Sequence, residues 1–243
     1  KEKWQGFWKP ILVVVMAIAL VLFEPDLGSS AVIFIVALSI MFIAGAPIKH
    51  LLVIFSLGIS VFVLMILTVP WRMKRILSFM NPWETYQEEG WQLSHSLIAF
   101  GRGDWFGVGL GESLQKLHYL PDAQTDFIFA IIAEELGLLF CIFLVFVFSF
   151  LVFKCFYIGR LARHAQYYLS SYIAYGAGIC IALHVFINIG VSSGMLPTKG
   201  ITLPFISFGG TNLLLMFALI ALVLRINFEI SESSLIKNKI LKF

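Results

Sequence analysis

Charge is scarce in this sequence. Lys, Arg, Asp and Glu make up 13% of the 243 residues, hydrophobic residues make up 60%, and the mean hydropathy is +0.93. A soluble domain carries about a quarter charged residues. The scarcity therefore excludes an ordinary soluble domain and predicts an integral membrane protein. The formal net charge of +3 is small and the cations are scattered, which gives no support to nucleic-acid binding.

Cysteine and the common catalytic signatures are scarce too. The three cysteines, Cys141, Cys155 and Cys180, lie in or beside apolar runs without a CxxC pair, so we expect free buried thiols. No HExxH, P-loop or Ser/His/Asp set is evident, and GVGLG at 107–111 follows no predicted strand. Zinc hydrolysis, phosphoryl transfer from ATP, serine chemistry and dinucleotide binding therefore lack support.

Long apolar runs take the place of charge. Six of them approach the roughly 20 residues that a helix needs to cross a bilayer, although Lys9-Pro10 interrupts the first. They predict an all-α fold, a polytopic transmembrane helix bundle with six spans. The expected spans are 4–23, 27–46, 51–69, 127–153, 168–191 and 211–228.

A large loop at 70–125 and a charged tail at 229–243 complete what we expect to be a single membrane domain. A loop of this length without structure of its own would be unusual. We therefore expect short amphipathic helices in it that lie on the membrane surface, for instance around 92–100.

The 17 Lys and Arg residues divide unequally between the two sets of helix ends, eleven against six. Because an excess of Lys and Arg marks the cytoplasmic side, the richer set and the 229–243 tail are predicted to be cytoplasmic. Three polar segments then share the outer face: the tight 24–30 connection, the 70–125 loop and the loop at 192–210. Their convergence is the strongest physical indication of a site.

Asp126 ends the polar loop, and an apolar helix follows directly, so its carboxylate lies where water gives way to hydrocarbon. Ionisable residues in such places are costly and commonly functional. If the helix starts at Asp126, the small residues Ala130, Ala133 and Gly137 lie within about 40° of it around the axis. Two interpretations stay open: a helix cap above a packing face, or a general base above a groove wide enough for a lipid chain.

Cations near this acid are candidates for binding phosphate or pyrophosphate groups. The residues that we assign to substrate or pyrophosphate binding are Lys116, Lys199, Arg102, Thr125 and Ser207. Three further cations of the same loop are better explained by contact with lipid headgroups, namely Arg72, Lys74 and Arg75.

Acids in or beside the membrane need partners. We assign Glu24, Asp26 and Glu134 as acids that support the site. Glu24 and Asp26 lie in a tight connection and are either a solvated turn with a helix cap or acids that face the site. Glu134 and Glu135 lie inside the fourth span, where pairing with a cation of another helix is the commoner explanation.

Three other polar residues have weaker claims. His184 and Asn188 lie one turn apart on the fifth span, where hydrogen bonding between helices is the default and a polar path is the alternative. His118 is a conceivable base, although a single loop histidine is more often a surface residue.

Several long motifs occur in a fixed order. They are EPDLGSS, MKRILSFMNPWE, YQEEGWQLSHSLIAFGRGDWFGVGLGESLQKL, KLHYLPDAQTDFIFAIIAEELG and GMLPTKGITLPFISFGGTNLL. Together they resemble the SEDS family (shape, elongation, division, sporulation), and the match runs from about residue 4 to residue 228. NPWE and SLQKL are more similar to the division branch of that family than to its elongation branch.

The resemblance implies a ten-helix membrane protein, so the first four helices are expected to be missing from this chain. It also implies a peptidoglycan glycosyltransferase that polymerises lipid II at the outer face of the cytoplasmic (inner) membrane during cell division. Asp126 falls on the catalytic Asp of the family. Its implied role is that of a general base toward the 4-hydroxyl of the acceptor's GlcNAc, while undecaprenyl pyrophosphate leaves.

Partners follow from the same resemblance: a class B penicillin-binding transpeptidase, other division proteins, lipid II and the membrane. No cofactor is assigned, although a divalent cation such as Mg²⁺ or Mn²⁺ would help to neutralise the leaving group. Two departures lie near the site. The division branch commonly has an acid where this chain has His118, and a histidine where it has Gln124.

Two other functions stay open at this point. A lipid II flippase would need polar residues through the membrane depth, and this sequence supplies only a few. A non-catalytic division scaffold would need neither these residues nor a base.

Overall fold

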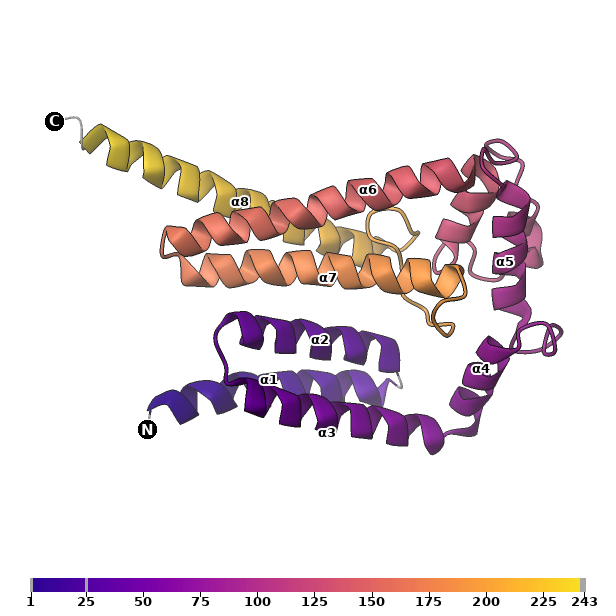
Figure 1. Cartoon of the computed structure of the whole chain (residues 1–243), viewed down its shortest axis with the longest axis horizontal. Helices are drawn as coiled ribbons and strands as arrows, with labels where there is room; N and C mark the ends of the chain where they lie inside the picture. Colours follow the sequence, from indigo (N-terminus) through magenta and orange to yellow (C-terminus); the bar gives the residue numbers. More distant parts are fainter. Residues whose placement is uncertain (1, 25, 241–243) are drawn as a thin grey trace.

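The computed structural model of the chain describes residues 2–24 and 26–240, with side chains within 9–24, 26–117 and 119–232. Every regular element in that part is helical, which confirms the all-α prediction (Figure 1). The elements are α1 (Glu2–Phe23), α2 (Leu27–Ile43), α3 (Ile48–Leu67), α4 (Pro70–Met80), α5 (Trp91–Gly103), η1 (Gln115–Tyr119), α6 (Ile128–His164), α7 (Tyr168–Ser192) and α8 (Gly210–Ile240).

Helix α7 lies at the centre of the bundle. It packs along α6 and also contacts α2, α5 and α8 (Figure 1). Small buried residues such as Ala174 and Ala177 bring its backbone close to its neighbours. Many large hydrophobic side chains of α3, α6 and α8 are exposed, as expected for helix faces that meet lipid rather than water.

Four helices of the described chain are long and apolar enough to cross a membrane: α3, α6, α7 and the Gly210–Glu232 part of α8. The apolar parts of α1 and α2, Lys9–Phe23 and Leu27–Ile43, are shorter. The prediction of an integral membrane helix bundle is therefore confirmed, whereas the predicted count of six spans is not.

Two helices run further than predicted. Helix α6 continues to His164, so the basic stretch after residue 153, expected to be a turn, is helical. Helix α8 continues through the predicted tail as far as Ile240. An i,i+4 ion pair between Arg225 Nε and Glu229 Oε1, at 2.9 Å, joins successive turns where the apolar run ends. Charged residues on successive turns thus extend these helices beyond their apolar parts.

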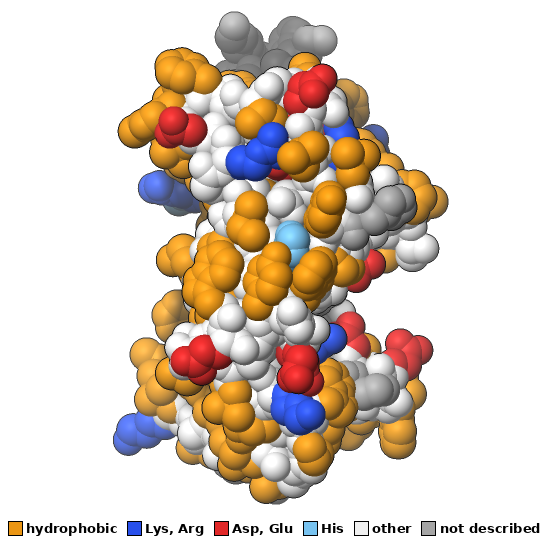
Figure 2. Space-filling view, turned by 90° about the vertical axis from the view of Figure 1, so that its right-hand side faces the viewer, with side chains coloured by type: hydrophobic (Ala, Val, Ile, Leu, Met, Phe, Trp, Pro, Cys, Tyr) orange, Lys and Arg blue, Asp and Glu red, His pale blue; other side chains and the backbone are white. Residues whose placement is uncertain are grey.

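The long loop contains short helices, as predicted. Helix α5 crosses the end of the bundle at a steep angle to α6 and α7 (Figure 1). Ala99 is buried against Ala130 and Ile131 of α6, and Gly103 lies directly against Ala133 of the same helix, so α5 covers this end of the bundle. Figure 2 looks at this end, where hydrophobic side chains are interspersed with acidic and basic ones.

Helix α6 is kinked at Gly137, whose φ of 74° lies in the left-handed region that favours glycine. The loop after α5 supplies hydrogen bonds at the kink. The N–H of Leu138 donates to the carbonyl oxygen of Asp104 at 2.9 Å, and the N–H of Val108 donates to that of Glu134 at 3.0 Å. The loop thereby pairs backbone groups that the kink removes from the helix.

Candidate active site at one end of the bundle

Asp126 lies in the turn that precedes α6, at the end of the bundle covered by α5. Its backbone N–H donates to the carbonyl oxygen of Asp122 at 3.1 Å, and its side chain is partly exposed. Helix α6 begins at Ile128, two residues after Asp126. The carboxylate is therefore held by a turn that precedes the helix.

Asn188 attaches the loop after α7 to this turn. The side chain is fully buried, and its Nδ2 donates to the carbonyl oxygens of Asp126 and Ile201, both at 2.8 Å. Hydrogen bonding between helices was expected, but both acceptors are backbone carbonyls outside the helices, one in the turn before α6 and one in the loop after α7. One amide joins the residue that carries the candidate base to the loop that carries Lys199.

Ser207 makes a second attachment. Its Oγ donates to the carbonyl oxygen of Thr125 at 2.5 Å and accepts from the N–H of Leu203 at 2.7 Å. The hydroxyl of Thr125 turns back to the carbonyl oxygen of Asp122 at 3.2 Å. Both hydroxyls assigned to substrate binding therefore make bonds that shape the turn and the loop.

Replacing Asn188 by Ala is expected to lower the free energy of unfolding by about 1–3 kcal/mol, because two buried carbonyl groups lose their donor. Thermal unfolding and hydrogen exchange of the 199–208 amides would measure the loss. Asn212→Ala is the matched control, since Asn212 bonds only the Thr202 hydroxyl, at 2.7 Å and partly exposed. Equal losses in the two variants would contradict the role assigned to Asn188.

The carboxyl group of Asp126 has a pKa close to neutral pH. Burial raises its pKa to about 6, and the charge of Asp122 acts in the same direction. Gly200 lies directly over it: a Cβ at that position would be 2.9 Å from Oδ2. Any larger residue there would crowd the carboxylate, so glycine allows this close approach of the loop to the acid. A carboxylate with such a pKa is suited to general-base chemistry.

Lys199 neighbours Gly200, but its side chain passes over Gly28 at the start of α2. Asp26 caps that helix, accepting from the N–H groups of Gly28 and Ser29 at 2.9 and 3.1 Å and from the Ser29 hydroxyl at 2.6 Å. Burial acts to raise the pKa of Asp26, but these bonds and the charge of Lys199 bring it below its usual value. The three segments predicted to converge, at 24–30, 70–125 and 192–210, do meet here, whereas Glu24 is exposed at the end of α1.

Glu134 is fully buried and pairs with a cation, as the commoner interpretation had it. Arg102 Nη1 lies 2.6 Å from its Oε1, and the Ser113 hydroxyl donates to Oε2. The N–H groups of Leu114 and Gln115 also point at the carboxylate, each at 3.3 Å. Glu134 therefore fastens the loop that precedes η1 to helix α6.

Glu135 takes up the second predicted substrate-binding cation. Lys116 Nζ lies 2.6 Å from Oε1 of Glu135, in a pair that is more exposed than that of Glu134. The structure thus places Arg102 and Lys116 against acids of α6, and of the three assigned cations only Lys199 lies beside the Asp126 turn without an ion pair among the described residues.

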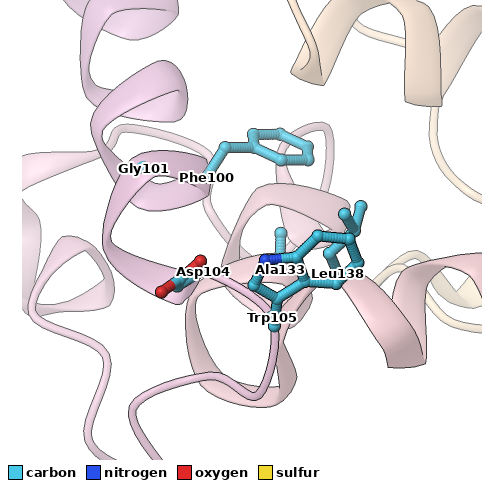
Figure 3. A pocket seen from close by; sticks show the side chains of 6 residues that line it. All are labelled: Phe100, Gly101, Asp104, Trp105, Ala133 and Leu138. Carbon is cyan, nitrogen blue, oxygen red and sulfur yellow. The ribbon is translucent and has the colours of Figure 1, made fainter.

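The small-residue face below Asp126 is filled by α5. Ala130 and Ala133 are buried, and a side chain on Gly103 of α5 would collide with the carbonyl group of Ala133. This face therefore packs helix on helix, and it is not the predicted lipid-chain groove. A cleft of about 320 Å³ opens instead beside the kink of α6 (Figure 3). It is lined by Phe100, Gly101, Asp104, Trp105, Ala133 and Leu138.

Other candidates do not join the site. His184 Nδ1 donates to the carbonyl oxygen of Cys180 in its own helix at 2.9 Å. The side chain of His118 lies outside the described residues. Within the described part of the chain, no three His, Cys, Asp or Glu side chains form a cluster that would hold a metal ion.

Comparison with known proteins places the chain in a family. The model of the FtsW/RodA/SpoVE cell cycle proteins matches residues 1–232. The chain belongs to this family. It is 47% identical over 234 residues to the probable peptidoglycan glycosyltransferase FtsW of Saccharophagus degradans, covering 96% of this chain and 60% of that protein. It is 45% identical over 229 residues to that of Escherichia coli, covering 94% and 55%. The chain thus spans less than two thirds of these relatives.

Solved structures of the family share the fold. One, described as a peptidoglycan synthase complex that coordinates polymerization and crosslinking, has a TM-score of 0.70 at 24% identity, covering 91% of this chain and 61% of the other. An aspartate-to-alanine mutant of the rod shape determining protein RodA of Thermus thermophilus has a TM-score of 0.60 at 23% identity, covering 92% and 57%. The helical arrangement of this chain is therefore that of FtsW/RodA proteins.

Proposed function

We propose that this chain forms part of a peptidoglycan glycosyltransferase that polymerises lipid II during cell division. The observation that carries the proposal is Asp126, a partly buried carboxylate with a pKa of about 6, beside Gly200 at one end of a membrane bundle. The curated relatives named probable peptidoglycan glycosyltransferase FtsW support the same activity.

In the proposed reaction Asp126 acts as general base. Its carboxylate takes the proton of the acceptor's GlcNAc 4-hydroxyl while that oxygen bonds the anomeric carbon of the donor. The bond from the anomeric carbon to the diphosphate oxygen breaks, and its electron pair leaves with undecaprenyl pyrophosphate. The anomeric centre inverts, so an α-linked donor becomes a β-linked glycan.

The proposed setting is the cytoplasmic membrane with Asp126 facing outward, as the distribution of Lys and Arg favours. A class B penicillin-binding transpeptidase is the proposed partner. The likeness to a chain from a complex that couples polymerization to crosslinking supports that pairing.

A flippase is less well supported. Glu134 and Glu135 are bound by Arg102 and Lys116, and Asn188 bonds two backbone carbonyls. These polar groups are engaged within the protein and lie toward the end of the bundle that carries Asp126. They therefore offer little for a polar path across the membrane.

The test is lipid II polymerisation by the protein with its transpeptidase partner, whose crosslinking is blocked. The 243-residue chain is compared with the same chain extended at its N-terminus to the length of the relatives. Glycan strands from either form would support the polymerase. Their absence from both, with lipid II transport or partner binding retained, would favour a flippase or a scaffold instead.

The polymerisation rate is expected to rise with pH through about 6, because only the deprotonated Asp126 can accept a proton and burial raises its pKa to about 6. Asp122→Asn should move this rise to lower pH, since the charge of Asp122 contributes to raising the pKa. Asn suits the positive φ of 55° at that position. Initial rates between pH 4.5 and 8 measure both, and a rate that is flat across about pH 6 would contradict the assignment.

A further inference from the structure

Three cations act on one another at the end of the bundle that carries Asp126. Arg72 and Arg75 lie on α4, which Figure 1 shows at this end, and Lys199 lies in the loop that follows α7. Among the described residues none of the three has an ion pair within 4 Å. Lys74, on the same helix, lies 3.9 Å from Glu89. The charges of Arg75 and Arg72 reach Lys199, where they add to burial in lowering its pKa.

The two arginines are held in place by one aromatic ring and by the backbone. Arg72 Cζ lies 5.3 Å and Arg75 Cζ 5.2 Å from the centre of the Trp71 ring. Arg72 Nη1 donates to the carbonyl oxygen of Met65 at 2.9 Å, which fixes it to the end of α3. Its Nε is buried and has no acceptor among the described residues. Buried donors are nearly always satisfied, so an unmatched one points to an acceptor outside the described residues, such as a bound anion.

Like charges held together in this way repel one another. The acid whose charge acts on Lys199 is Asp26, and its carboxylate already accepts three hydrogen bonds at the start of α2. An anion with several oxygens would relieve the repulsion and satisfy the arginine donors. Phosphate groups fit best, because guanidinium groups bind their oxygens in pairs and lysine adds a point charge.

These cations are placed to bind the leaving group of the reaction rather than to contact the base Asp126. Burial and Asp122 raise the pKa of Asp126, and no cation opposes them. Lys199 adjoins Gly200, which lies over Asp126, but its side chain points away across Gly28. In an inverting displacement the attacking and leaving oxygens lie on opposite sides of the anomeric carbon. A base and an anion site that are adjacent but separate match that geometry.

We infer that Arg72, Arg75 and Lys199 form the subsite for the diphosphate of the polyprenyl-linked donor, which puts the donor on the α2–α4 side of Asp126. The inference rests on the proposed function. It replaces the expectation that Arg72 and Arg75 only touch lipid headgroups, and it reduces the predicted set of substrate-binding cations, since Arg102 and Lys116 are bound to acids of α6.

Binding of undecaprenyl pyrophosphate to the full-length protein in nanodiscs of zwitterionic lipid tests the subsite, with undecaprenol as the probe that lacks phosphate. Arg75→Gln and Lys199→Gln should each weaken binding of undecaprenyl pyrophosphate by roughly 10- to 100-fold, as expected for lost hydrogen bonds to a charged group. Binding of undecaprenol should not change. Lys74→Gln is the matched control on the same helix and should bind like the wild type.

Two further arms separate the alternatives. Association with phosphatidylglycerol vesicles reports contact with lipid headgroups. If Arg75→Gln and Lys199→Gln weaken vesicle association but still bind undecaprenyl pyrophosphate like the wild type, the proposed subsite is wrong. Asp126→Asn should bind undecaprenyl pyrophosphate normally without making glycan. An Asp126→Asn protein that polymerises, together with weak binding by Arg75→Gln, would reject the base and leave the subsite intact.

Discussion

Asp126→Asn is expected to reduce lipid II polymerisation by roughly 10²- to 10⁴-fold, the range that a positioned general base contributes. Asparagine keeps the size and shape of the side chain but cannot accept the proton. Because the substrate contacts should persist, the loss should appear in kcat and leave KM nearly unchanged. Glycan formation by wild-type and variant proteins, each with the transpeptidase partner, measures the effect.

The same substitution should not destabilise the fold. A loss of activity without a loss of stability would therefore indicate a catalytic role. Burial raises the pKa of Asp126 from 3.8 to about 6, so the folded state disfavours the charged form relative to the unfolded state. Above about pH 6 this charge lowers stability, and the penalty disappears as the pH falls through 6 toward 4. Neutral Asn at pH 7.5 should therefore unfold at the same temperature as wild type or higher. Loss of activity accompanied by a lower unfolding temperature would instead indicate a structural role.

Much of the architecture could be predicted because hydrocarbon-facing helices must be apolar over their whole length. The apolar runs gave the six long helices approximately, and the long loop was rightly expected to contain helices such as α5. The ends were less certain. The charged residues after 153 and after 228 suggested that the helices end there, but α6 and α8 continue. A helix pairs its own backbone groups, so it can extend beyond the membrane.

The small-residue face shows what periodicity alone leaves open. Ala130 and Ala133 were correctly placed on one side of α6, but a stripe of small residues suits either a ligand or a close helix. The close approach of Gly103 on α5 to Ala133 decides the matter, and the loop that follows α5 is held at the kink of Gly137. A positive φ at a glycine within a helix is not evident from sequence.

Which cation pairs with which acid was the least predictable feature of the site. The sequence offered several cations for few acids, and the structure assigns Arg102 to Glu134 and leaves Arg75 beside Lys199. These pairs come from segments distant in sequence, so no spacing rule connects them. The burial of Asn188 against two carbonyl groups, likewise, depends on a loop that folds back onto the Asp126 turn.

Glu134→Ala should have the largest effect on stability, lowering the free energy of unfolding by about 3 kcal/mol. That is the low end of the range for breaking a buried ion pair, because Arg102 is 38% exposed and can recover water whereas Glu134 is fully buried. The change also removes the acceptor of the Ser113 hydroxyl and of two backbone N–H groups. Unfolding of the purified protein in mixed micelles with increasing SDS would measure the loss.

Glu135→Ala is the matched control, since it removes the neighbouring acid from its pair with Lys116, whose side chain is 33% exposed while that of Glu135 is 14% exposed. We expect it to lower the free energy of unfolding by about 1 kcal/mol. Equal losses for the two glutamates would show that burial does not set the cost. Because Glu134 contacts the loop before η1 and not the Asp126 turn, its loss should reduce the amount of folded protein more than the rate per folded molecule. Asp126→Asn should instead reduce the rate per folded molecule and leave the amount of folded protein unchanged. The two substitutions thereby distinguish a catalytic acid from a structural one.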